Sequence, residues 1–327
     1  MTGPGQPRFR DRGEFGPTID AAGERLRISP TAVEKDYWVS EVLRVMASEF
    51  AGDFILKGGT SLSKGYRLIQ RFSEDIDILV LPGTRGRDAT DKLMKRMSER
   101  GAAGVGGTAT RFGEAETGRH RSYDVHYPTL RSVTDLIRTS VLLEMGVRGG
   151  AEPSESTAIS CLLGDVLAEA GTDLSDYSDL GLFEVVVLHP GRTLLEKLVG
   201  VHAEARRLAA DPVRVADRRT GRHFYDIHEL LADQPVRDLL ADRNEVERIL
   251  REVAETTLAH FTKPGETVEI RPPGGFAESP AFELASGVSE RLRAAYGATM
   301  PELYFGPGPL PSWEAIARRV IENRGLL

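Results

Sequence analysis

The sequence predicts an α+β fold, in which a mixed β-sheet with N-terminal helices is followed by a C-terminal helical half. Up to Leu188, short apolar segments that end at glycine or proline alternate with segments of helical periodicity. After Pro190 the apolar residues recur at helical spacing only. We therefore expect a boundary near Pro190, with residues 1–190 as the core domain and residues 191–327 as a helical domain.

The first half contains the elements that define the fold class. Ser29 is a good N-cap residue and Pro30 is tolerated at the first helical position, so a helix is expected from there to about Glu49. Before it, residues 1–27 are expected to form an arm and a short amphipathic piece. Further helices are expected at 62–69, 88–100 and 159–170, a turn at 101–107, and strands at 54–57, 76–80, 123–127, 139–147 and 183–188.

The second half is expected to be helical. Its clearest periodic segments are residues 193–210, 225–232, 244–260 and 288–296.

Composition excludes several classes of protein. With 40% hydrophobic and 28% charged residues, the chain has the composition of a globular protein, and it contains no apolar run long enough for a membrane span or signal peptide. The single cysteine, Cys161, cannot form an intramolecular disulfide, so we expect a cytoplasmic protein. The net charge of −7 argues against coating of nucleic acid by overall attraction, so any RNA would be held by local basic patches.

A glycine turn follows the first expected strand. Gly58 and Gly59 allow a close backbone approach to a phosphate, and Thr60 and Ser61 would begin the following helix, whose N-terminus favours anions. An ordinary turn has the same appearance. The segment is not a Walker A loop, because Lys64 is preceded by serine and followed by glycine.

Two aspartates lie on the next expected strand. Because strand side chains alternate between faces, Asp75 and Asp77 point to one side while Ile76 and Ile78 point into the core. Two adjacent carboxylates repel each other unless a cation lies between them, and hard oxygen ligands suit Mg²⁺. A solvent-facing acidic strand end is the simpler alternative. The glycine turn sixteen residues before Asp75 favours a metal site that carries substrate phosphates.

A third carboxylate is expected on a neighbouring strand. Glu144 interrupts an apolar strand, and a charge in that setting needs a partner. It is a candidate metal ligand that also helps to activate an attacking hydroxyl. The alternative is an ion pair with Arg148 at the strand edge, and Asp124 is the reserve candidate.

These segments resemble the AbiEii/AbiGii family of nucleotidyltransferase toxins, which includes the mycobacterial MenT proteins. The resemblance is carried by Lys57-Gly58-Gly59-Thr60-Ser61-Leu62-Ser63-Lys64 and Arg71-Phe72-Ser73-Glu74-Asp75-Ile76-Asp77-Ile78. It extends to Val33-Glu34-Lys35-Asp36-Tyr37, Arg192-Thr193-Leu194-Leu195-Glu196-Lys197-Leu198 and Arg222-His223-Phe224-Tyr225-Asp226-Ile227. These motifs span about two thirds of the chain, from about residue 28 to residue 230.

The resemblance implies a polymerase-β-like nucleotidyltransferase core and a helical domain that completes the active cleft. It also implies a toxin that a cognate antitoxin neutralises, and that transfers a nucleotide, often a pyrimidine, from an NTP to the 3′ end of tRNA and so stops translation. Mg²⁺, or Mn²⁺ in its place, would be the cofactor.

The resemblance also assigns residues by position. Asp75 and Asp77 match the metal-binding pair, and Glu144 occupies the place of the third carboxylate. Lys197 and Asp226 match a lysine and an aspartate required for activity. The nucleotide-binding residues are then Gly58, Gly59, Thr60, Ser61, Lys64 and Lys197.

Lys197 and Asp226 also have simpler interpretations. Leu194, Leu198, Val201, Ala205 and Leu208 form the expected buried stripe of a helix, with Lys197 at its edge, where its ammonium could enter a cleft or simply reach solvent. Asp226 could be an ordinary carboxylate near a helix start.

Positive charge is concentrated shortly before Asp226. The cluster contains Arg206, Arg207, Arg214, Arg218, Arg219, Arg222 and His223. A patch of this kind can hold an RNA backbone, and Arg214, Arg218, Arg219 and Arg222 are the candidate RNA contacts. A solvated helix face balanced by Glu204, Asp211 and Asp217 explains the pattern equally well.

Two other functions remain open. The same centre could modify a protein or a small molecule such as an aminoglycoside. The chain could also be a regulator that binds nucleotides without turnover, although such a protein has no need of two adjacent carboxylates.

Overall fold

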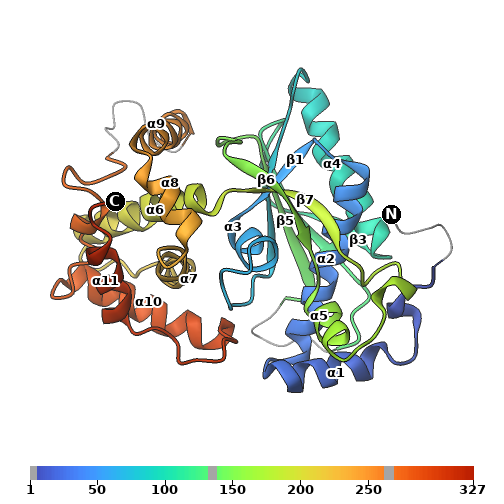
Figure 1. Cartoon of the computed structure of the whole chain (residues 1–327). Coiled ribbons are helices and arrows are strands. Elements are labelled where there is room, and N and C mark those ends of the chain that lie inside the picture. The colour runs from blue at the N-terminus through green and yellow to red at the C-terminus, as the bar shows by residue number, and fades with distance from the viewer. Residues whose placement is uncertain (1–5, 132–137, 261–268) are drawn as a thin grey trace. The chain divides into compact units, whose positions relative to one another are not determined.

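The computed structural model of the chain describes residues 6–131, 138–260 and 269–327 and divides into two compact units (Figure 1). The first unit runs to Arg67 and continues as Phe72–Arg148 and Ser154–Leu188. The second contains Leu68–Arg71, Gly149–Pro153 and His189–Leu327. Residues 1–5 of the expected N-terminal arm lie outside the described residues.

The first unit is built on a seven-stranded mixed sheet in the order β3-β4-β5-β2-β1-β7-β6. The strands are β1 (Phe54–Lys57), β2 (Asp75–Val80), β3 (Thr108–Glu116), β4 (His120–His126), β5 (Ser140–Gly146), β6 (Ser154–Ile159) and β7 (Phe183–Leu188). At its centre, β1 pairs antiparallel with β2 and parallel with β7, and β2 pairs parallel with β5. The α+β fold with a mixed sheet is therefore confirmed.

Helices cover one face of this sheet and form the core with it. They are α1 (Phe15–Leu26), α2 (Pro30–Glu49), α4 (Arg87–Gly104) and α5 (Leu162–Glu169), beside short 3-10 turns η1 (Phe9–Asp11) and η3 (Leu174–Asp176). The helix α2 begins as expected, with the Ser29 hydroxyl accepting a hydrogen bond from the Thr31 amide at 3.2 Å. Ile76 and Ile78 are fully buried in this core, as the alternation on β2 predicted.

The turn expected at 101–107 begins only at Val105, because α4 continues to Gly104. The reason is close packing between two helices. A Cβ on Gly101 would lie 3.2 Å from Cγ1 of Val42, and one on Gly104 would lie 2.3 Å from Cγ2 of Val45. These glycines therefore allow α4 to approach α2 instead of ending the helix.

Two strands were not expected, and both lie at the edges of the sheet. Strands β3 and β6 are the first and last in the order, and their residues are mostly polar and at least partly exposed. The sequence signal of an apolar strand is therefore missing there. The helix expected at 159–170 begins only at Leu162, since Ile159 ends β6.

In place of the helix expected at 62–69, the structure has two shorter helical segments that begin and end earlier. The chain forms α3 (Gly58–Thr60) and then the short η2 (Ser61–Gly65), which is a π-helix. Arg67 has φ 54°, a left-handed conformation that ends helical geometry. The following segment, Leu68–Arg71, belongs to the second unit.

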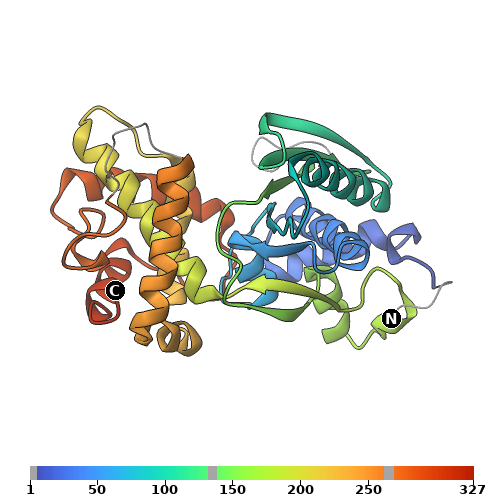
Figure 2. The ribbon, with the colours of Figure 1, turned by 90° about the horizontal axis from the view of Figure 1, so that it is seen from above.

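The second unit is helical, as expected. It contains α6 (Pro190–Ala210), α7 (Arg218–Leu230), α8 (Gln234–Ala241), α9 (Arg243–His260), α10 (Gly287–Leu303) and α11 (Trp313–Glu322), with a short η4 (Phe276–Glu278). Helix α7 packs against α6, α10 and α11. Helix α9, the long orange helix of Figure 2, packs against α6 and α8. The expected stripe of α6 is confirmed, because Leu194, Leu198, Val201, Ala205 and Leu208 are fully buried. No helix among the described residues has the length and apolar character that crossing a membrane requires.

Candidate active site

Three carboxylates share one face of the sheet in the first unit. On β2, Asp75 and Asp77 alternate with buried isoleucines and point to the face opposite the core. Asp77 lies beside Lys57 of β1 on one side and Glu144 of β5 on the other in the strand register. Because residues paired across strands project to the same face, Glu144 joins the aspartates.

The backbone of Gly58 lies directly against the carboxylate of Asp77. A Cβ on Gly58 would be 2.3 Å from Oδ2 of Asp77 and 3.2 Å from its Cβ, and Gly58 has φ +72°. Any other residue would therefore be strained and would displace the carboxylate. The glycine turn and the aspartate pair, which are separate motifs in the sequence, form one structural feature.

One hydroxyl group of the turn holds it to β2, and a second one closes the turn itself. Thr60 Oγ1 donates to the Asp75 carbonyl at 2.5 Å, and Ser61 Oγ donates to the Gly58 carbonyl at 2.9 Å. Thr60 and Ser61, which follow Gly58 and Gly59 in this turn, are both fully buried. A nucleotide contact of these two residues would therefore involve their backbone amides, and this role remains a prediction.

Two charged residues of α2 fix the segment that carries the turn and the aspartates. Lys35 Nζ donates to Glu74 Oε2 at 2.6 Å, and Asp36 Oδ1 accepts from Lys64 Nζ at 2.5 Å. Lys64 also donates to Ser40 Oγ at 2.8 Å. Burial lowers the pKa of Lys35, although Glu74 opposes this effect. The two ion pairs therefore connect both ends of the segment to α2.

This arrangement explains the burial of Lys64 without a nucleotide. Its ammonium is directed to α2, while its expected role in nucleotide binding remains a prediction. Lys35 and Asp36 belong to a motif that carried the family resemblance, but no pattern in the sequence assigns them a position beside Asp75. Their signal was the presence of adjacent charges inside an otherwise apolar helix.

The carboxylates are compatible with a divalent cation. Among residues 6–131, 138–260 and 269–327, no three His, Cys, Asp or Glu side chains already converge in the manner of a metal site. Mg²⁺ is commonly bound through one or two protein carboxylates together with substrate phosphates and water. Asp75 and Asp77, two positions apart on one strand face, are the donor set that fits this coordination, with Glu144 on the adjacent strand.

The second unit contains a buried cluster of three charges. Arg71 donates to both oxygens of Asp226, from Nε at 2.6 Å and from Nη2 at 2.8 Å. Lys197 Nζ lies 2.8 Å from Asp226 Oδ2. The side chain of Asp226 is 0% exposed and that of Lys197 is 9% exposed. The structure thus brings together the two predicted residues of this unit and adds Arg71, which sequence reasoning did not single out.

The charges in this cluster shift each other's pKa values. Burial raises the pKa of Asp226, but the cations Arg71 and Lys197 lower it by more, so it lies below its ordinary value. Burial is also the main cause of a lowered pKa for Lys197, which Asp226 opposes and Arg71 reinforces. Asp226 is therefore a stable anion, whereas Lys197 bears a charge that its surroundings disfavour.

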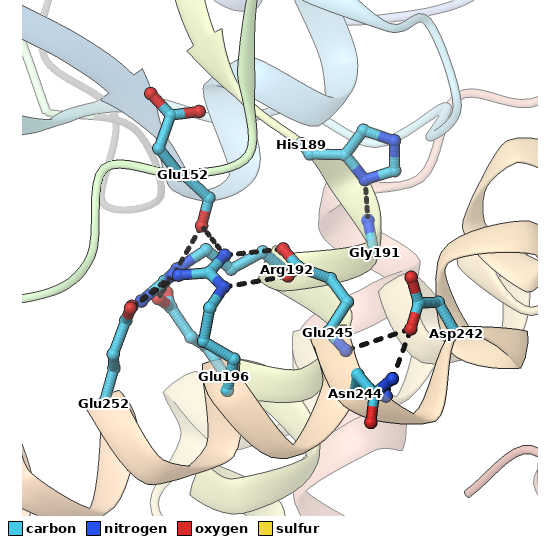
Figure 3. Close-up of polar contacts among 10 residues, drawn as sticks. Glu152, His189, Gly191, Arg192, Glu196, Asp242, Asn244, Glu245 and Glu252 are labelled. Atoms are coloured by element: carbon cyan, nitrogen blue, oxygen red, sulfur yellow. Dashed lines mark hydrogen bonds and ion pairs between the residues drawn. The ribbon is translucent and has the colours of Figure 1, made fainter.

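A polar network fixes the first turns of α6, just before Lys197 (Figure 3). The Arg192 guanidinium donates to the Glu152 carbonyl at 2.6 Å and to Glu252 Oε2 at 2.8 Å. Arg248 of α9 donates to the same Glu152 carbonyl at 3.1 Å. The side chain of Arg192 is fully buried. The network therefore joins α6, α9 and the segment Gly149–Pro153 within the second unit.

Several basic residues around α7 contact groups of the second unit. Arg207 and Arg214 lie 3.1 Å and 3.5 Å from Glu204, and Arg218 donates to the Ala298 carbonyl at 3.0 Å. Asp217 caps α7 by accepting from the Arg219 amide at 2.9 Å. The predicted RNA contacts Arg214, Arg218, Arg219 and Arg222 remain a prediction.

Comparisons with known proteins agree with this architecture. A search of the curated proteins gives no match. The chain is similar in structure to MenT4, a nucleotidyltransferase toxin from Mycobacterium tuberculosis H37Rv, with a TM-score of 0.57, 18% sequence identity, and coverage of 94% of this chain and 90% of that one. The family model described as "Nucleotidyl transferase AbiEii toxin, Type IV TA system" matches residues 41–319. The chain therefore belongs to the AbiEii family of nucleotidyltransferase toxins from type IV toxin–antitoxin systems.

Proposed function

We propose that this toxin transfers a nucleoside monophosphate from a pyrimidine NTP to the 3′ hydroxyl of tRNA, with release of pyrophosphate, and thereby blocks translation. The observation that supports the proposal most strongly is the contact of Gly58 with Asp77, because it combines a close-approach turn with a carboxylate face. Phosphoryl transfer depends mainly on positioning and charge stabilisation, and these are what such a feature supplies.

The proposed roles follow the chemistry of each side chain. Asp75 and Asp77 would hold Mg²⁺, or Mn²⁺, with Glu144 as a further ligand. When bound, the cation would neutralise triphosphate charge and orient the reacting phosphate. Glu144 would also accept the proton of the attacking hydroxyl. Lys197 would balance charge on the triphosphate, since its own charge lacks full compensation in the buried cluster.

The remaining parts of the proposal concern domains and partners. Residues 1–190 would act as the nucleotidyltransferase core, and residues 191–327 would provide Lys197 and Asp226. Arg214, Arg218, Arg219 and Arg222 would contact the tRNA backbone. A cognate antitoxin protein would neutralise the toxin, as the type IV family assignment supports. The cytoplasm, where tRNA and NTPs are available, would be the site of action.

The test is transfer of label from each of the four α-³²P-labelled NTPs to total RNA or total protein. We expect label at the 3′ end of tRNA, with CTP or UTP preferred and with dependence on a divalent cation. Asp77→Ala should abolish transfer. Asp53→Asn, which alters a surface carboxylate 2.7 Å from Arg85 beyond the other end of β1, should transfer at the wild-type rate.

The acceptor decides between the alternatives. Label found only on protein, or on an added aminoglycoside, would contradict the tRNA proposal while preserving nucleotidyl transfer. Tight NTP binding without label on any acceptor would instead favour a non-catalytic regulator. Continued transfer by Asp77→Ala would overturn the assignment of the reaction centre.

A further inference from the structure

The segment Leu68–Arg71 is held tightly within the second unit. The Gln70 amide donates to the Tyr225 hydroxyl at 3.0 Å, and the Phe305 amide donates to the Gln70 carbonyl at 3.0 Å. Arg71 also forms an isolated antiparallel β-bridge with Tyr304. The backbone on which the Arg71 side chain depends is thus fixed by α7 and by the residues after α10.

Arg71 and Asp226 are both too deeply buried, as arranged, to touch a substrate. Their side chains are 1% and 0% exposed, and the guanidinium pairs with both carboxylate oxygens. A two-point pair of this kind fixes the plane of the carboxylate, which a single ammonium does not. The orientation of Asp226, and with it the oxygen that Lys197 contacts, is therefore set by Arg71.

Two cations contact the same carboxylate in this cluster. Arg71 and Lys197 carry two positive charges and Asp226 one negative charge, all within ion-pair distance. Burial lowers the pKa of Lys197, and Asp226 only partly offsets this effect. Lys197 is the most exposed of the three side chains, at 9%. Lys197 is therefore the cation whose side chain can rotate toward a bound anion, while Arg71 keeps Asp226 paired.

Two nearby polar atoms also have no partner. Oγ1 of Thr193, one turn before Lys197 on α6, and Nδ1 of His223, one turn before Asp226 on α7, are buried without a hydrogen bond among the described residues. Burial, reinforced by the charge of Lys197, lowers the pKa of His223 well below its ordinary value, so a neutral imidazole faces the cluster. A buried hydroxyl and a buried imidazole nitrogen without hydrogen bonds, beside the two cations, fit a phosphate-bearing ligand.

We propose that Arg71 is a positioning residue for nucleotidyl transfer, which holds Asp226 from both oxygens so that Lys197 is presented to the triphosphate. This inference rests on the proposed function. It assigns Asp226 to the support of Lys197 rather than to contact with substrate. Without Arg71, Lys197 would be the only partner of a buried carboxylate and would be retained by it.

The test compares Arg71→Lys with a matched change in another pair. Arg71→Lys keeps the charge and loses the two-point contact. Arg121→Lys does the same to a buried pair of the first unit, in which Arg121 contacts both oxygens of Asp91 at 2.6 Å. We expect both variants to lower the melting temperature by similar amounts. Only Arg71→Lys should raise the KM for NTP, by roughly tenfold, with a smaller change in kcat.

A second variant keeps the inference testable if Arg71→Lys does not fold. Arg71→Met/Asp226→Asn removes one cation and the anion together, so no buried carboxylate is left unpaired and Lys197, the most exposed of the three side chains, remains; the variant should fold but bind NTP weakly. Equal KM values for wild type, Arg71→Lys and Arg121→Lys would overturn the inference, as would wild-type KM in the double variant. Absence of transfer by the wild type would contradict the proposed function instead. In that case, binding of inorganic triphosphate, measured by calorimetry, should still weaken in Arg71→Lys and not in Arg121→Lys, and equal binding would overturn the inference.

Discussion

Gly58 and Asp77 are in such close contact that no side chain fits between them, since a Cβ on Gly58 would lie 2.3 Å from Asp77 Oδ2. We therefore expect Gly58→Ala to be costly in two ways. Its positive φ should destabilise the fold by about 1–3 kcal/mol. Displacement of the carboxylate should lower kcat/KM for NTP by roughly 100-fold. Chemical denaturation and initial rates measure the two effects.

Gly52→Ala is the control that separates the effect of backbone strain from the effect of the contact with Asp77. Gly52 has φ +80° but nothing within 4 Å of the added Cβ, so the variant carries the same backbone strain alone. It should lose stability and keep its transfer rate. If Gly58→Ala were as active as Gly52→Ala, the contact with Asp77 would have no catalytic importance.

Lys197→Met should abolish transfer but stabilise the protein. The folded state lowers the pKa of Lys197, mainly through burial, so folding disfavours the charged form relative to the unfolded chain. Asp226 keeps its two-point pair with Arg71 in the variant. We expect an equal or higher melting temperature than that of the wild type, measured by calorimetry at pH 7.

The stability gained by Lys197→Met should decrease as the pH rises. Between the lowered folded pKa and the unfolded pKa near 10.5, the unfolded wild type binds more protons, so its stability rises with pH. The advantage of Lys197→Met should therefore be largest below the folded pKa and shrink as pH approaches 10.5. An advantage that grows with pH would contradict the assignment.

Lys64→Met tests whether this lysine serves the fold or the nucleotide. Its ammonium lies 2.5 Å from Asp36, and both side chains are buried. Removing one partner of such a pair should cost about 3–5 kcal/mol of stability. If the role is structural, Lys64→Met/Asp36→Asn should recover much of that stability, measured by denaturation, with an unchanged KM for NTP. A raised KM in the stable double variant would instead support the predicted nucleotide contact.

Charge reversal at Arg218 and Arg219 tests the basic cluster. If these residues contact phosphates, the Arg218→Glu/Arg219→Glu variant should bind tRNA more weakly and lower the salt slope by roughly 1–2. Binding isotherms at several salt concentrations measure this. Arg25→Glu/Arg100→Glu changes the net charge equally at exposed arginines of the first unit and should leave the slope unchanged. Equal slopes in both variants would favour a solvated helix face.

The sequence alone determined the alternation on β2 and the helical second half. A period of two residues dictates that Asp75 and Asp77 share a face while Ile76 is buried, whatever surrounds the strand. The apolar stripe of α6 is likewise a local pattern. Because these features depend on neighbours in sequence, periodicity was sufficient to predict them.

Only the tertiary structure decided which distant residues meet. The contact of Gly58 with Asp77 depends on the pairing of β1 with β2, and the pairing of Arg71 with Asp226 joins residues 155 positions apart. Helix α4 continues through its glycines because α2 lies against it, and η2 stops early because Arg67 takes a left-handed conformation. Packing and ion pairing between residues far apart in the chain produce these features, and neither leaves a periodic trace in the sequence.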